Sequence, residues 1–456
     1  MSTNPPPLGP CPPRFVELKK QIAESFGPDF EERVTRAWRE ILNELKDATE
    51  SIAKQGSDIV PSVNFADLDK MSEADMESIR RRGCVVIRDV VDDQEALSWR
   101  EVMRAYVTQN PVNGFPEEDK QFFQLYWTKP QVLARAHPNV LAASVWLNKF
   151  YHAKNGFAEA AGDVDLNAPL SYADRFRMRH PGVQWNAHPP HVDGGAIERW
   201  EDPNFRSCFA DILKGNWREH DPYDLVGRVN AKSSLYRREN QSTVFRTFQG
   251  WLAFSETAPN QGTLQVFPDV VLANAYIILR PFFSPVENPV GDPLDGDNWK
   301  FDISYADFPG IFSIGAAFTG PRPTPESHPH LRLERAMISV PKVNAGDMVF
   351  WHCDLIHAVE LEHTGKEDSC GSFSVAYWLP ARLTPSSWTT VMYIPAMPYT
   401  AQNAAYVSRQ KEHFIKGIPP PDFPQWAGEG GFEGKAIADD VVDLGARRAM
   451  GLVSVA

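Results

Sequence analysis

Hydrophobic residues recur at every third or fourth position over residues 14–53, which is the spacing of an amphipathic helix. Gly27-Pro28 interrupts this pattern, so we predict two helices that meet near the pair. Similar apolar spacing predicts further helices over residues 64–82, 93–109 and 130–153. We therefore expect a mostly helical N-terminal part over residues 14–170, preceded by a proline-rich, disordered tail over residues 1–13.

Strand-like segments become frequent in the middle of the chain, from about Tyr172. Short runs rich in β-branched and aromatic residues predict strands within 83–91, 172–179, 245–255, 263–267 and 339–351. Residues 271–281 are apolar and fit either a helix or a strand, since their periodicity favours neither. Residues 291–301 are rich in Gly, Asp and Pro and predict a loop.

The C-terminal part of the chain becomes helical again. An amphipathic pattern predicts a helix over residues 401–414 that ends at Gly417, with prolines just beyond it. We expect one domain over residues 14–456, with a strand-rich core over 171–400 and a C-terminal helix and tail over 401–456.

The amino-acid composition indicates which kinds of partner and which cellular compartment to expect. The chain has 456 residues, 43% of them hydrophobic, which is enough to build a substantial core. A net charge of −13 makes a nucleic-acid partner unexpected, because phosphates repel acidic surfaces. No apolar run is long enough for a membrane span, and the N-terminus lacks the apolar core of a signal peptide. Five scattered cysteines suit a reducing compartment, so we expect a cytoplasmic protein.

Two short motifs contain residues of the types that hold metal ions. His191-Val192-Asp193 is followed by a Gly-Gly pair, and His357 lies just after the strand-like run 348–351. Residues i and i+2 of a strand face the same side, so His191 and Asp193 can reach one ion from a strand or its end. Two histidines and one carboxylate leave about three positions of a six-coordinate metal open, as in non-haem Fe(II) oxygenases. We predict that His191, Asp193 and His357 are metal ligands and catalytic residues.

Three further polar residues flank these motifs, and a His-x-Asp tripeptide also occurs by chance. We interpret His188, His352 and Asp354 as partners that orient the ligating imidazoles, with His352 as the most plausible substitute ligand. The alternative for His191 alone is an ordinary histidine bonded to a loop.

Longer motifs resemble a known family. Gly83–Val91 is similar to the opening strand of phytanoyl-CoA-hydroxylase-like oxygenases, and Asn260–Pro268 resembles their Asn-x-Gly-x-Leu-x-x-x-Pro strand. A closer resemblance, to the YbiU-like family, also called DUF1479, covers about residues 61–433. It rests on the segments ADRFRMR (173–179), HVDGGAIERW (191–200), WHCDLIHAVE (351–360) and VMYIPAMP (391–398).

The resemblance implies a fold and a chemistry. The implied fold is mainly β with helical additions: a double-stranded β-helix (jelly-roll, cupin-like) core flanked by α-helices. The implied reaction uses Fe(II), 2-oxoglutarate and O2 to oxidise an unactivated C–H bond of a small molecule, giving succinate and CO2. Hydroxylation is the usual outcome of such reactions, and desaturation or ring closure also occurs. Some fungal relatives act on free amino acids, including aziridine formation, so a small amino acid from secondary metabolism is our expected substrate.

The far carboxylate of 2-oxoglutarate requires a fixed cation, preferably an arginine that pairs bidentately. Many members of the wider superfamily place this arginine about ten residues after the distal histidine, where this chain has only Lys366. We instead expect Arg177 or Arg179, with Arg175 beside them, because the three alternate on a predicted strand before His191. The alternative is a surface row paired with acids such as Asp174 and Glu198. Residues predicted to line the same pocket are Gln249 and Trp251.

One stretch, residues 371–386, departs from the family pattern by lengthening the connection after His357. It is either an insertion or a retained intron, and it could spoil the site. Two other classes of function therefore remain open: a non-catalytic jelly-roll binding protein, and a Zn(II) hydrolase in which the metal-bound water is the nucleophile.

Overall fold

The computed structural model describes residues 8–153, 164–364 and 389–453. Lys366 and the stretch 371–386, both singled out from the sequence, lie outside the described residues. Within the described part of the chain, none of the helices combines the length and the apolar character that crossing a membrane requires.

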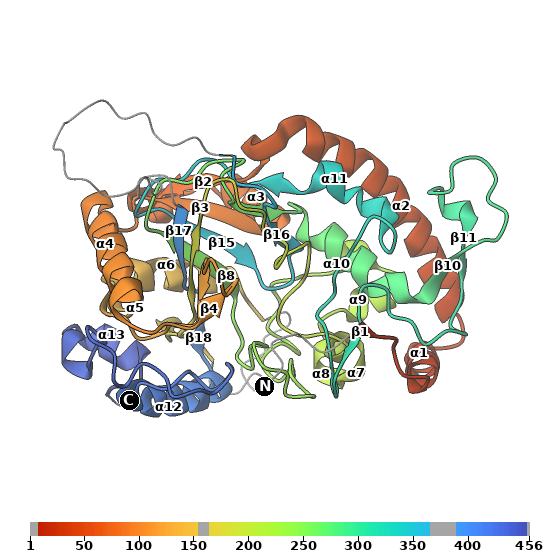
Figure 1. Ribbon diagram of the computed structural model, residues 1–456. Coiled ribbons are helices and arrows are strands. Elements are labelled where there is room, and N and C mark those ends of the chain that lie inside the picture. Colours follow the sequence, from red (N-terminus) through yellow and green to blue (C-terminus); the bar gives the residue numbers. More distant parts are fainter. Residues whose placement is uncertain (1–7, 154–163, 365–388, 454–456) are drawn as a thin grey trace.

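The N-terminal helices form one flank of the molecule. As predicted, the first segment is two helices, α1 (Arg14–Ser25) and α2 (Phe30–Gln55), and Gly27 between them has a φ of 98°. The buried stripe of α2 carries Trp38, whose ring stacks on Tyr276 at 5.1 Å between centroids. Tyr276 belongs to α10 (Val270–Leu279), so the ambiguous apolar run 271–281 is a helix that lies beside α2 (Figure 1).

An eight-stranded mixed sheet forms the centre of the fold. All neighbouring strands are antiparallel except the parallel pair of β2 and β3. Its strands, in spatial order, are β2 (Ser62–Asn64), β3 (Cys84–Arg88), β15 (Met348–His352), β8 (Phe248–Ala253), β17 (Thr389–Tyr393), β7 (Phe176–Arg179), β5 (Phe122–Phe123) and β4 (Gly114–Phe115).

The two faces of this sheet bury different side chains. One face carries residues such as Val85, Phe350 and Met392, which join a core with α4 (Asp93–Gln109), α5 (Lys129–Ala136) and α6 (Pro138–Asn148). The opposite face presents alternate residues of the same strands, because successive side chains of a strand point to opposite sides. Register pairs Trp351 with Gln249, and Val391 with Arg177, so all four share that second face.

A smaller three-stranded sheet lies on the side of this second face. Its order is β14 (Ile338–Ser339), β9 (Leu264–Val266) and β16 (His357–Val359). The short connection 353–356 carries the chain from β15 of the large sheet to β16 of the small one, which places His357 at the start of β16. Leu264 and Val266 of β9 join Trp251 and Trp351 in one hydrophobic core.

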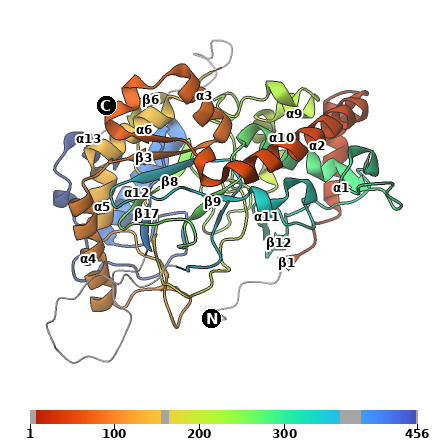
Figure 2. The same ribbon diagram turned by 90° about the horizontal axis from the view of Figure 1, so that it is seen from above.

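The remaining elements complete both ends of the molecule. α12 (Ala401–Lys416) ends at Gly417, whose φ is 71°, as predicted, and it lies with α13 (Leu444–Ala449) at the opposite end from α2 (Figure 2). The other elements are β6 (Asp165–Pro169), β18 (Pro398–Tyr399), β10 (Phe283–Pro285), β12 (Ser313–Ile314), β13 (Ala317–Phe318), α3 (Glu73–Arg82), α7 (Glu198–Glu201), α8 (Pro203–Ser207), α9 (Ala210–Leu213) and α11 (Leu333–Ala336).

Several expectations about local structure need correction. The segment 64–82 is helical as α3 only from Glu73, since its first part is a short strand and a 3-10 turn. The segment 130–153 is two helices, because a residue that precedes proline disfavours helical geometry and His137 is extended before Pro138. The loop 291–301 ends in strand β11 (Trp299–Phe301). Residues 8–9 form strand β1, paired with β12, so the tail is ordered from Leu8.

The fold class is mixed α/β, which corrects the expectation of a mainly β protein. More of the described chain lies in helices than in strands, and the strands are short. Long amphipathic helices such as α2 and α12 each bury one face in a hydrophobic core, so helices as well as sheets build the interior.

Candidate metal centre

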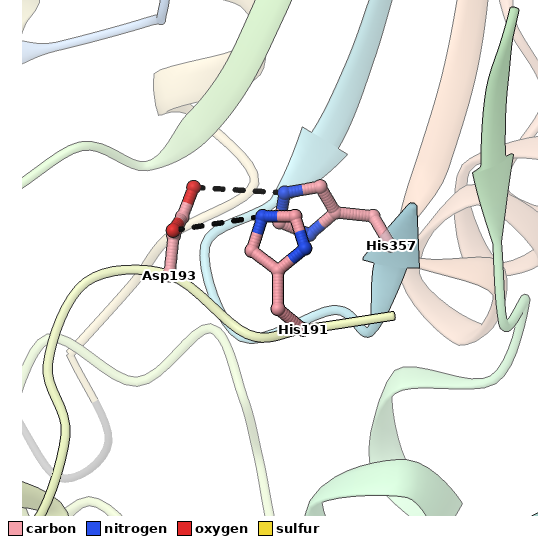
Figure 3. Close-up of side chains that lie close together, drawn as sticks. All are labelled: His191, Asp193 and His357. Atoms are coloured by element: carbon pink, nitrogen blue, oxygen red, sulfur yellow. Dashed lines mark ion pairs between the residues drawn. The ribbon is translucent and has the colours of Figure 1, made fainter. Parts of the chain in front are cut away.

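His191, Asp193 and His357 converge on one point (Figure 3). Their ligating atoms all lie within 4.8 Å of one another. The carboxylate of Asp193 faces both imidazoles from one side, with its Oδ1 3.8 Å from Nε2 of His191 and its Oδ2 3.6 Å from Nε2 of His357 (Figure 3). The structure therefore brings together three residues that the sequence separates into two motifs.

Backbone pairing brings the two histidines together. The N–H of His191 donates to the carbonyl of His357 at 2.9 Å, and the N–H of His357 donates back at 3.0 Å. This is a hydrogen-bonded antiparallel pair, in which facing residues lie close together. The imidazole centroids are 4.2 Å apart. The reciprocal backbone hydrogen bonds at the start of β16 therefore hold the two imidazole rings side by side.

The Nδ1 atom of each imidazole is held by a backbone carbonyl two residues earlier. Nδ1 of His191 lies 2.7 Å from the carbonyl oxygen of Pro189, and Nδ1 of His357 lies 3.0 Å from that of Leu355. A carbonyl only accepts, so Nδ1 carries the hydrogen and Nε2 keeps its lone pair directed toward Asp193. Burial, and then the neighbouring His357, lower the pKa of His191 to about 4. The imidazole of His191 is therefore neutral at physiological pH.

The carboxylate of Asp193 is held from the sheet. In the amide orientation that satisfies both neighbours, Gln249 donates to Oδ2 of Asp193 at 2.9 Å and accepts from Nε1 of Trp351 at 3.1 Å. Burial alone would raise the pKa of Asp193, but His191 and His357 outweigh it and hold that pKa well below its usual range. The predicted pocket residue Gln249 thus acts on the ligand carboxylate itself.

The turn after Asp193 depends on its two glycines. Gly194 has a φ of 71° and Gly195 a φ of 124°, a left-handed region that residues with a side chain rarely adopt. A Cβ atom at Gly195 would lie 2.6 Å from Cε1 of Phe205. The sharp turn that the Gly-Gly pair predicts is therefore present, and it lets the chain leave the centre without displacing Asp193.

A buried ion-pair network ties this turn to the connection before His357. Nη2 of Arg199 donates to the backbone carbonyl of Asp193 at 2.7 Å, and its Nη1 pairs with Asp354 at 2.6 Å. Arg228 pairs with the other oxygen of Asp354. All three side chains are buried, and the two guanidinium groups hold the pKa of Asp354 far below its usual range despite burial. The network links the two ligand-bearing segments.

The flanking residues have roles that differ from those expected. His352 contacts Tyr151 and the carbonyl of Pro222 through Nε2, and Asp354 binds arginines, so neither orients a ligating imidazole. His188 accepts a hydrogen bond from Nε1 of Trp185 and lines the cavity beside the centre. His352, Cys353 and Asp354 also form a second group of residues that could hold a metal ion, but Asp354 already has two cationic partners.

His191, Asp193 and His357 lie at a cavity of about 230 Å³. Its wall includes the inward-facing sheet residues Gln249, Trp251, Trp351 and Arg177, and all three predicted ligands. A cavity of this size suits small molecules, because drug-sized ligands occupy larger pockets.

The three arginines of the β7 segment differ in their surroundings. Arg177 lines the cavity and is 2% exposed, yet its Nε and Nη1 have no hydrogen-bond partner within the described chain. Arg179 donates to the carbonyls of Glu360 and Val183, and it is absent from the described cavity wall. Arg175 lines the cavity but pairs with Asp174 at 2.9 Å. Nε of Arg179 is also unpaired, so Arg177 is distinguished by combining unpaired donors with a place in the cavity wall.

Three further arginines of the cavity wall were missed by sequence reasoning. Arg238 and Arg246 lie in the segment that leads into β8, and Arg322 lies in a loop far from them in the chain. They belong to no recognised motif, and although Arg246 falls within the predicted strand 245–255, the sequence carries no signal that assigns the three to this cavity.

Comparisons with known proteins match nearly the whole chain to one protein family. Residues 9–452 match the family described as Gig2-like. The chain is 31% identical over 437 residues to the uncharacterised protein YbiU of Escherichia coli (strain K12), covering 91% of this chain and 92% of that protein.

Solved structures agree with this match. The structure of GlcNAc Inducible Gene 2, GIG2 (DUF1479), from Candida albicans has a TM-score of 0.81 at 31% identity, covering 98% of this chain and 91% of that one. A Salmonella typhimurium LT2 protein, provisionally assigned as an oxidoreductase, has a TM-score of 0.74 at 27% identity, covering 97% and 98%.

Proposed function

The chain belongs to the Gig2-like family, and from its metal centre we propose that it is a non-haem Fe(II)- and 2-oxoglutarate-dependent oxygenase. The observation that carries the proposal is the arrangement of His191, Asp193 and His357 at a cavity. Two imidazoles and one carboxylate are the ligand set of such enzymes, and they leave positions open for other ligands. The provisional assignment of the Salmonella relative as an oxidoreductase supports the same reaction class.

The chemistry and the closeness of the donor set support the binding of Fe(II). Both Nδ1 atoms are bound to carbonyls, both Nε2 atoms face the carboxylate, and Gln249 holds that carboxylate in place. Partners of this kind fix ligand orientation and tune the metal. When bound, Fe(II) with 2-oxoglutarate supplies the activation of O2: one oxygen atom enters succinate, released with CO2, and the other oxidises a C–H bond.

Arg177 is the proposed partner of the far carboxylate of 2-oxoglutarate. Its buried guanidinium lines the cavity with two unpaired nitrogen atoms. Arg179 is absent from the described cavity wall and donates to backbone carbonyls, and Arg175 is paired with Asp174. A buried cation without a counter-charge is unfavourable, and a bidentate carboxylate would neutralise it. Gln249 and Arg175 then complete the wall beside the co-substrate.

The proposed substrate is a small molecule with an unactivated C–H bond, and amino acids are the first group to test. Hydroxylation and oxidative cyclisation, such as aziridine formation, are the proposed outcomes. The proposed core is a double-stranded β-helix, in which the eight-stranded and three-stranded sheets are its two layers. The crossing of the chain from β15 to β16 between these sheets supports that interpretation.

Binding of the co-substrate tests the role of Arg177. We expect Arg177→Gln to weaken anaerobic 2-oxoglutarate binding to the Fe(II) protein by about tenfold to hundredfold, because a charge-assisted bidentate pair is lost. Fe(II) affinity, measured by equilibrium dialysis, should stay unchanged. Arg175→Gln is the matched control, since Arg175 lines the same wall but already has an acidic partner. Equal 2-oxoglutarate affinity in wild type and Arg177→Gln would contradict the assignment.

A further inference from the structure

The cavity wall carries more positive charge than the proposed co-substrate uses. Five arginines line it against two carboxylates, Asp193 and Asp174. Asp174 is paired with Arg175, and Asp193 faces the two histidines. With Arg177 assigned to 2-oxoglutarate, three guanidinium groups remain, those of Arg238, Arg246 and Arg322.

These three arginines lack acidic partners within the described chain. No ion pair or side-chain hydrogen bond joins any of their guanidinium groups to another described residue, and the buried Nε of Arg238 is unpaired. Arg199 and Arg228, by contrast, share Asp354, and the buried Arg179 donates to backbone carbonyls. The contrast is notable because unpaired cations in a partly buried wall cost free energy unless a ligand neutralises them.

The three arginine side chains line the same cavity as the proposed metal ligands, His191 and Asp193 among them. Burial lowers the pKa of Arg238; the charge of Asp193 opposes this shift, and that of Arg322 adds to it. Like charges therefore converge where a substrate would have to lie.

The backbone holds this cluster beside the ligand motif. The N–H of Val192 donates to the carbonyl of Pro321 at 2.9 Å, which fixes Arg322 next to the segment that carries His191 and Asp193. Arg246 lies just before β8, the strand of Gln249. The cluster thus borders the metal centre from loops, whereas Arg177 reaches the cavity from strand β7.

We propose that Arg238, Arg246 and Arg322 bind an anionic group of the organic substrate, a carboxylate or a phosphate, so that the enzyme selects small molecules of net negative charge. This inference rests on the proposed oxygenase function for its statement about substrate, but the anion site itself is independent of the metal. The described cavity wall offers no unengaged carboxylate for an ammonium group, so acidic molecules should bind better than zwitterionic amino acids.

The test uses metal-free full-length protein and inorganic phosphate as the probe, followed by isothermal titration calorimetry. An Arg177→Gln background removes the proposed co-substrate site. In it, we expect phosphate binding to persist and to weaken at least tenfold on adding Arg246→Gln or Arg322→Gln. Arg246→Lys should recover part of the affinity, because it restores the charge. The matched control is Arg237→Gln, an exposed arginine of the same loop as Arg238 that does not line the cavity.

Two results would overturn the inference: no phosphate binding by folded protein, or equal affinity in Arg246→Gln and Arg237→Gln. Circular dichroism and thermal melting of each variant separate lost binding from lost folding. Titration of Fe(II) and 2-oxoglutarate into the same proteins separates the two proposals. A 2-oxoglutarate complex without phosphate binding refutes only the anion site, and phosphate binding without that complex refutes only the oxygenase.

A second readout addresses the substrate class. In the iron-loaded enzyme, succinate release should be stimulated by small dicarboxylates or phosphate esters more than by their neutral amides. Stimulation that is equal for acids and amides would contradict the proposed selection by charge.

Discussion

Replacing Asp354 by asparagine should destabilise the protein strongly. The carboxylate is 2% exposed and pairs with Arg199 at 2.6 Å and with Arg228. Asparagine keeps the volume but removes the charge, so two guanidinium groups, themselves nearly fully buried, lose their only acidic partner in the described chain. Breaking a buried pair by removing one partner costs about 3–5 kcal/mol. We expect the free energy of unfolding of Asp354→Asn to fall by that amount at pH 7.

The stability lost in Asp354→Asn depends on pH because folding lowers the pKa of Asp354. The arginines hold the pKa of Asp354 far below its unfolded value of about 3.9. A depressed folded pKa contributes stability above the unfolded pKa and loses it as pH falls toward the folded pKa. The difference between wild type and Asp354→Asn should therefore be constant between about pH 6 and 8 and shrink below about pH 4.

Urea unfolding followed by tryptophan fluorescence measures this difference. The matched control is Asp297→Asn, whose exposed pair with Arg39 at 3.1 Å should contribute no more than about 1 kcal/mol. Since Arg199 also holds the carbonyl of Asp193, folded Asp354→Asn should bind Fe(II) more weakly than wild type. A loss no larger than that of Asp297→Asn would refute the role given to the network.

Further substitutions test the surroundings of the metal centre. Gln249→Leu removes the amide donor of the ligand carboxylate and should weaken Fe(II) binding about tenfold to hundredfold in equilibrium dialysis, with little change in thermal stability. Gly195→Ala should cost about 1–3 kcal/mol in urea unfolding, because its φ is 124° and the new Cβ would meet Phe205; an unchanged midpoint would contradict this. Glu360→Gln should cost about 2 kcal/mol in the same assay, since its carboxylate accepts three backbone N–H groups of the turn 260–263.

Local rules explain why the three central residues could be found from the sequence. His191 and Asp193 are two positions apart, the Gly-Gly pair permits the turn, and His357 follows a strongly apolar strand. The helices around Gly27 were predictable for the same reason, because helical periodicity is a local property. The sequence did not reveal the reciprocal hydrogen bonds between His191 and His357, which depend on long-range pairing.

Tertiary structure decides what the sequence left open. Arg175, Arg177 and Arg179 alternate identically, yet one is paired with an acid, one has unpaired donors and one is bonded to carbonyls. Alternation along a strand specifies which face of the sheet a side chain lies on, but not which residues it contacts there. Arg238 and Arg322 lie on irregular loops, whose course is set by packing rather than by any periodic pattern. The expectation of a mainly β protein came from the fold that the family resemblance implied, whereas long helices such as α2 and α12 make the fold mixed α/β.

The most direct measurement is the anaerobic addition of Fe(II) and 2-oxoglutarate to the purified metal-free protein, followed by visible absorption. The proposed function predicts the weak charge-transfer band of a chelated Fe(II) complex in wild type and its loss in His191→Ala and His357→Ala. A folded, iron-loaded protein that shows no band, or a band that survives both substitutions, would contradict the assignment of this site to an Fe(II)- and 2-oxoglutarate-dependent oxygenase.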